Sequence, residues 1–162
     1  GGPPVFPYQP PGIWSDQFMG RFTYRPSLGP AAYRRTLYAF WRRSSAPTFL
    51  FDNAMRRTCE VTPRRTNTPL HALTLLNDKT SLEAARRLAA FDVREIYRRV
   101  LSREPSEREL QVCELQRQKA LAFYKTDAQA TEDFSAGGNA EKAAMTLVAN
   151  LILNLDEALT HE

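Results

Sequence analysis

Residues 64–78 read Arg-Arg-Thr-Asn-Thr-Pro-Leu-His-Ala-Leu-Thr-Leu-Leu-Asn-Asp and contain the clearest helix boundary in the chain. Thr68 can cap free backbone amides, and Pro69 follows at the first helical position, where a missing N–H costs nothing. A helix is therefore expected to begin at Pro69. Asn77 can adopt the left-handed conformation that ends a helix, and Asp78 can cap the next one. The stretch predicts a tight helical hairpin.

Helix signals continue through the residues that follow this hairpin. Asp92 precedes apolar residues at helical spacing, and Ser106 with Glu109 has the spacing of a capping box at the start of a long helix toward Tyr124. The sequence shows no strand alternation of useful length. It therefore predicts an all-α fold, a helical bundle of about five to six helices.

The last helix is expected to lie at the centre of this bundle. A polar loop ending at Gly137-Gly138 precedes it, and its apolar residues form a nearly continuous stripe from Ala144 to Leu159. A helix that is apolar over so much of its surface is usually buried.

Residues 1–30 differ in composition, because they contain seven prolines interleaved with aromatic residues. Proline at that density excludes a continuous helix, whereas a disordered tail would be poor in aromatics. We expect an extended strap whose rings pack on the body of the domain, residues 31–162, with a short helical turn around residues 14–19. A proline-rich ligand for another protein is the alternative interpretation.

Residues 31–43 carry Tyr33, Leu37, Phe40 and Trp41 at helical spacing, beside two arginine pairs. This pattern predicts an amphipathic helix with a cationic flank. Residues 44–63 are expected to form an irregular loop, and loops of that length are often functional.

The composition is that of one ordinary globular domain: 162 residues, 43% hydrophobic and 25% charged. No apolar stretch approaches the roughly 20 residues of a membrane span, so none is expected. The first residues lack an initiator methionine and the order of a signal peptide. We expect a piece of a longer protein, whose address signal lies elsewhere.

The net charge of +4 is distributed unevenly along the chain. Residues 1–65 contain ten arginines, no lysine and three acidic residues. Arginine favours planar, bidentate pairing with carboxylates or phosphates, or stacking on aromatic rings. Salt bridges to the more acidic second part of the chain explain the asymmetry equally simply.

The two cysteines, Cys59 and Cys113, fit neither a zinc site nor a haem-attachment motif, because no Cys-x-x-Cys pair occurs. His71 and His161 are isolated. The cysteines are either one disulfide or two buried thiols. We expect no cofactor in this chain.

Several motifs together resemble a known family. They are Gly1-Gly2-Pro3, residues 7–14 (Pro-Tyr-Gln-Pro-Pro-Gly-Ile-Trp), residues 33–43 (Tyr-Arg-Arg-Thr-Leu-Tyr-Ala-Phe-Trp-Arg-Arg), Phe51-Asp52, Arg57, Cys59 and residues 65–78. The chain resembles the later part of a planctomycete-type domain of unknown function, which lies C-terminal to cytochrome c-like domains in long secreted or periplasmic proteins. The resemblance implies a periplasmic or secreted setting, with haem c on a missing upstream domain.

The first functional hypothesis is a non-catalytic structural or interaction module of such a multidomain protein. Its partners would be other domains of the same polypeptide, or an anionic polymer or protein. The expected binding residues are cationic or aromatic: Arg56, Arg57, Arg64, Arg65, Asn67 and Trp41. Alternatively, these arginines and Asn67 simply tie the proline-broken loop to helix ends.

Two other functional classes are the alternatives. Part of a hydrolytic enzyme acting on a polymer would use acids such as Asp52 and Glu60, or His71 as a base, but paired carboxylates must flank the scissile bond at a defined separation. Nucleic-acid binding is disfavoured. The second helix of the hairpin offers only Arg86 and Arg87 as base readers.

Overall fold

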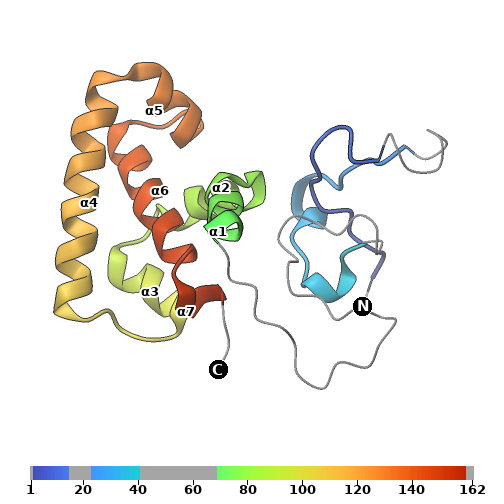
Figure 1. Cartoon of the computed structure of the whole chain (residues 1–162), viewed down its shortest axis with the longest axis horizontal. Helices are drawn as coiled ribbons and strands as arrows, with labels where there is room; N and C mark the ends of the chain where they lie inside the picture. Colours follow the sequence, from blue (N-terminus) through green and yellow to red (C-terminus); the bar gives the residue numbers. More distant parts are fainter. Residues whose placement is uncertain (1, 15–22, 41–68, 160–162) are drawn as a thin grey trace. The chain divides into compact units, whose positions relative to one another are not determined.

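The structure is a computed structural model that describes residues 2–14, 23–40 and 69–159 (Figure 1). The chain divides into two compact units, residues 1–71 and 72–162. Within the described part there are seven α-helices and no β-sheet. The all-α helical prediction is confirmed, with one or two more helices than expected. The division between a strap, residues 1–30, and a body stays a prediction.

In the first unit, Val5 of the strap pairs with the backbone of residues 38–40. The Val5 N–H donates to the Tyr38 carbonyl (2.8 Å), and the Phe40 N–H donates to the Val5 carbonyl (2.6 Å). The rings of Phe6 and Phe40 lie 4.7 Å apart, and Trp14 is buried. A strap ring therefore packs on a ring outside the strap, as the composition of residues 1–30 indicates.

The amphipathic helix predicted for residues 31–43 is wrong for the residues that the structure describes. Short 3-10 turns occupy Gly29–Ala32 and Thr36–Tyr38 instead. The physical reason is that the Phe40 N–H bonds to Val5 rather than to a preceding helical turn. Of the apolar side chains at helical spacing, Phe40 packs on Phe6 of the strap, and Leu37 remains 86% exposed.

Both helices predicted from this stretch are present, but they pack little against each other. Helix α1 spans Pro69–Asn77 and helix α2 spans Lys79–Leu88. Asp78 caps α2 by accepting hydrogen bonds from the N–H groups of Thr80 and Ser81 (2.9 and 3.3 Å). The left-handed conformation predicted for Asn77 is wrong, because Asn77 completes α1 and its side-chain amide donates to the Leu73 carbonyl (2.8 Å).

Three helices follow, α3 (Val93–Leu101), α4 (Glu107–Thr126) and α5 (Ala128–Ser135). The predicted caps of α3 and α4 are confirmed at Asp92 and Ser106. The polar loop expected before Gly137 is wrong, since α5 occupies most of it. Asp127 ends α4 and caps α5 through the Ala130 N–H (2.9 Å), so a single residue makes both boundaries.

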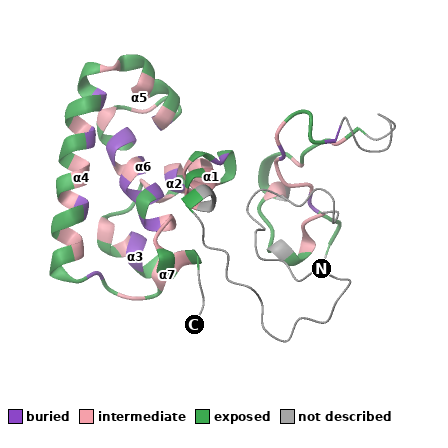
Figure 2. Ribbon diagram, in the orientation of Figure 1, coloured by how far each residue is buried: buried purple, intermediate pink, exposed green. Residues whose placement is uncertain are grey.

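Helix α6 (Ala140–Leu153) is the centre of the second unit and contacts α2, α3, α4 and α5. Figure 2 shows its buried residues along most of its length. Ala143, Ala144 and Ala149 are fully buried, so neighbouring helices approach α6 closely. The predicted stripe is interrupted. The Asn154 side chain bonds back to the Asn150 carbonyl (2.8 Å), and a short helix α7 (Asp156–Leu159) follows.

Across the described ranges, no helix combines the length and the hydrophobicity that a transmembrane span requires.

Candidate functional site

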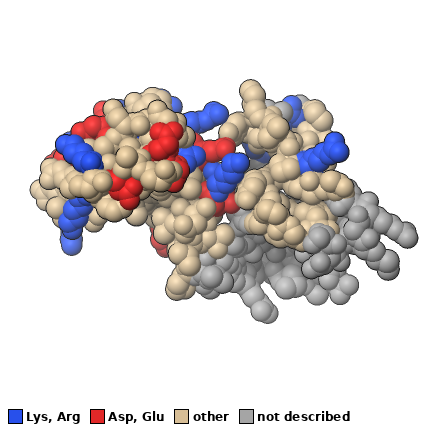
Figure 3. Space-filling model, turned by 90° about the horizontal axis from the view of Figure 1, so that it is seen from above, with Lys and Arg blue, Asp and Glu red and all other residues tan. Residues whose placement is uncertain are grey.

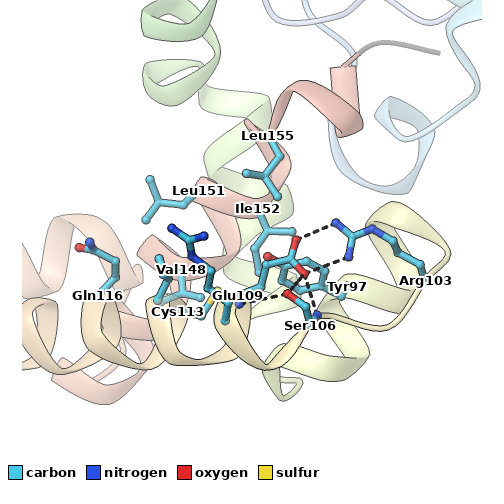
Figure 4. Close-up of a pocket in the computed structure, with 12 residues that line it drawn as sticks. Tyr97, Arg103, Ser106, Glu109, Cys113, Gln116, Val148, Leu151, Ile152 and Leu155 are labelled. Atoms are coloured by element: carbon cyan, nitrogen blue, oxygen red, sulfur yellow. Dashed lines mark hydrogen bonds and ion pairs between the residues drawn. The ribbon is translucent and has the colours of Figure 1, made fainter. Parts of the chain in front are cut away.

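A pocket of about 460 Å³ lies in the second unit between α4 and α6 (Figure 4). Apolar side chains form most of its wall: Val112, Cys113, Val148, Leu151, Ile152 and Leu155. Polar side chains line the remainder: Tyr97, Arg103, Ser106, Arg108, Glu109 and Gln116. This size and this mixture are typical of small-molecule sites. The pocket is therefore the candidate site in the described part of the chain.

Arg103 joins two acidic side chains beside the pocket. Its guanidinium donates to Glu109 at 2.7 and 3.1 Å and to Glu157 at 2.7 and 2.8 Å. It also lies 5.4 Å from the ring centroid of Tyr97. Two carboxylates hold the planar guanidinium in one orientation. The cluster connects the α3–α4 loop to both α4 and α7.

Glu109 is held as an anion by donors on two sides. Besides Arg103, it accepts from the backbone N–H and the hydroxyl of Ser106 (2.7 and 2.8 Å), which completes the capping box of α4 (Figure 4). These donors, Arg103 first, lower the pKa of Glu109 to about 2. Glu109 is therefore a structural anion at neutral pH and no proton donor.

This pKa predicts a loss of stability in acid. The folded-state pKa of Glu109 lies below its ordinary value of 4.5, so its contribution is complete above that value and is lost as the pH falls toward 2. We expect the free energy of unfolding, measured by urea denaturation, to fall between about pH 5 and pH 2. In Glu109→Gln, the free energy of unfolding should decrease less over this pH range. An equally steep fall in the variant would show that Glu109 does not contribute.

Tyr97 and Cys113 form the inner wall of the pocket. Burial raises the pKa of Tyr97 to about 12 and also raises the pKa of the Cys113 thiol, while a hydrogen bond joins the two side chains. Both groups therefore stay neutral at neutral pH, and a neutral thiol is a poor nucleophile. Cys113 carries a free, buried thiol, which fits the alternative of two thiols rather than the disulfide, and Cys59 lies outside the described residues.

Arg108 and Gln116 line the same pocket and are the polar groups that remain available there. In the described part of the chain, neither makes a hydrogen bond or ion pair. Neighbouring arginines differ, because acidic side chains or carbonyls engage Arg86, Arg94, Arg98, Arg99, Arg103 and Arg117. Figure 3 shows acidic and basic side chains next to one another on this unit. The cation of Arg108 is thus open to a ligand.

The six predicted binding residues all lie outside the described part of the chain: Trp41, Arg56, Arg57, Arg64, Arg65 and Asn67. Asp52, Glu60 and the side chain of His71 lie outside it as well. Among the side chains that the structure describes, no group of three or more His, Cys, Asp or Glu is arranged to hold a metal ion.

The pocket was not predicted from the sequence. Ser106 and Glu109 were recognised only as a helix cap, and Val148, Leu151 and Ile152 only as an apolar stripe. One signal was present, since Arg108, Val112 and Gln116 recur every fourth residue and therefore share one side of α4. The facing residues of α6 lie more than 30 positions later, and local spacing does not pair them.

Comparison with family models matches residues 1–116 to the family PSD1, described as "Protein of unknown function (DUF1553)". The chain belongs to this family. The DUF1553 match covers the strap, α1 to α3 and the first half of α4 as far as Gln116. It therefore includes Arg103, Arg108 and Glu109 but not the α6 wall of the pocket. No curated protein and no solved structure matches the chain significantly.

Proposed function

We propose that this DUF1553 chain is a non-catalytic interaction module of a larger periplasmic or secreted protein of the planctomycete type. Haem c is carried by another domain of that protein, and the module docks against its neighbouring domains. The setting rests on the resemblance of residues 7–14, 33–43 and 65–78 to the cytochrome c-associated domain.

An apolar stripe on the outer side of α4 carries the proposal. Leu115 and Phe123 are 50% and 55% exposed. At 100° per residue they fall within about a quarter of a turn, so they form one surface. A second side of α4, about a third of a turn away, is already buried through Cys113, Ala120 and Tyr124. An apolar stripe of this kind is typical of a surface that another domain covers.

The charges of the second unit support a structural role for its ionic groups. Glu114 pairs with Arg117 at 2.9 Å, and the Arg117 guanidinium lowers the pKa of Glu114 to about 2. Such fixed ion pairs hold helices and turns rather than move protons. Arg56, Arg57, Arg64 and Arg65 would supply the contacts to an acidic partner surface.

The association with a haem c domain is tested by purifying the full-length polypeptide from its source and treating it with alkaline pyridine. We expect the visible spectrum of covalently attached haem c. A polypeptide without haem would overturn the cytochrome setting, and turnover of a polymeric substrate by the chain would overturn the non-catalytic role.

The docking surface is tested by titrating the remainder of the full-length polypeptide into the chain by calorimetry. A double variant in which serine replaces both Leu115 and Phe123 should bind about tenfold or more weakly, because central apolar contacts dominate such interfaces. Leu159→Ser is the matched control. It removes a 38% exposed leucine from α7 and should leave the affinity within about twofold. If Leu159→Ser weakened binding as much as the double replacement, the α4 stripe would be excluded as the docking surface.

A further inference from the structure

We propose that the pocket between α4 and α6 binds a small apolar molecule carrying one anionic group, and that Arg108 pairs with that group. This site is separate in function from the docking of a neighbouring domain, because the ligand enters a cavity rather than covering the outer side of α4.

The apolar wall sets the larger part of the ligand. Val112 on α4 is 51% exposed and Leu151 on α6 is 41% exposed, while Val148 and Ile152 at the base are buried. A ligand between the two helices removes both exposed side chains from water. The free energy gained is about 25 cal/mol for each Å² of apolar surface covered.

The charges around the pocket set the sign of the ligand. The donors of Arg103 are taken by Glu109 and Glu157, and Glu109 accepts from both Arg103 and Ser106. In the described wall of the pocket, a cationic ligand therefore finds no carboxylate that lacks a hydrogen-bond donor. Arg108 has no ion pair with any described residue, so an anion satisfies it without breaking a bond.

The spacing along α4 sets the length of the ligand. Arg108, Val112 and Gln116 follow one another at intervals of four residues on the same side of the helix. The eight residues between the cation and the amide rise about 12 Å. The anionic group lies at the Arg108 end, the apolar body crosses Val112, and the amide of Gln116 can hydrogen-bond a polar atom at the far end.

Two fluorescent probes with the same ring system separate these contributions. Anilinonaphthalene sulfonate is anionic, and N-phenyl-1-naphthylamine lacks the sulfonate. Both are titrated into the full 162-residue chain, and dissociation constants are measured for the wild type and for three variants. Near-ultraviolet circular dichroism verifies that each variant is folded.

Arg108→Gln should weaken the anionic probe about five- to tenfold, the usual effect of one solvent-accessible charged hydrogen bond, and leave the neutral probe unchanged. Lys125→Gln is the matched control. It removes the same charge about 25 Å further along α4, measured by helix rise, and should affect neither probe. Val112→Trp should weaken both probes, because the larger side chain occupies the groove from an exposed position.

The proposal is overturned if Arg108→Gln weakens the two probes equally, or if Lys125→Gln acts as strongly as Arg108→Gln. It is also overturned if Val112→Trp leaves both probes unaffected, since they then bind elsewhere. None of these readouts involves a neighbouring domain, so failure here is distinguishable from failure of the proposed docking function.

Discussion

Replacing Ile152 with alanine should lower the free energy of unfolding by about 3 kcal/mol. Ile152 is 2% exposed and lies where α6 packs against Ile96 and Tyr97 of α3. The substitution removes three buried carbon atoms, so the folded state loses the free energy gained by transferring them out of water. It also leaves a cavity that rigid helices cannot close. Urea denaturation followed by circular dichroism measures the change.

Leu151→Ala is the control for this prediction. Leu151 is the preceding residue of α6, but it is 41% exposed at the pocket wall, so its truncation should cost about 1 kcal/mol or less. If both variants lost the same stability, the assignment of the core to the α3-facing side of α6 would be wrong.

Replacing Arg103 with methionine should lower the free energy of unfolding by about 1–2 kcal/mol, a range reduced for solvent screening because the side chain is 37% exposed. The substitution leaves Glu109 and Glu157 close to each other without the cation between them. Hydrogen exchange should become faster in the backbone of α7, because Arg103 links Glu157 to the α3–α4 loop.

Arg98→Met is the comparison for Arg103. Among the residues that the structure describes, Arg98 pairs only with Glu95 and Glu104, both within six residues, so these ion pairs tie no distant element. We expect unchanged exchange in α7 and a stability close to that of the wild type. Faster α7 exchange in both variants would indicate a general charge effect rather than a specific link.

Helix boundaries were the most predictable part of this fold. Asp78, Asp92 and Ser106 each precede a helix and satisfy its free amides, and these bonds depend on residues two or three positions away. The central position of α6 was also predictable, since so many apolar residues in one helix need several neighbours to cover them.

Features that depend on distant contacts were not predictable. The apolar side chains of residues 33–40 have helical spacing, yet the backbone here pairs with Val5. The Tyr38 carbonyl accepts from the Val5 N–H, and the Phe40 N–H donates to the Val5 carbonyl. The pairing of Arg103 with Glu157 crosses 54 residues, and many glutamates in this chain were equally suitable by sequence. The pocket depends on how α4 diverges from α6, which no single helix specifies.

The central position of α6 also has a consequence for synthesis on the ribosome. Helices α2, α3, α4 and α5 are all made before α6, and each packs on it. Isolated helices of 8–10 residues, such as α2, α3 and α5, are marginal in water. Until residues 140–153 emerge from the exit tunnel, the nascent chain therefore displays its apolar surfaces to the cell, and cooperative folding of this unit begins only when its last long helix is available.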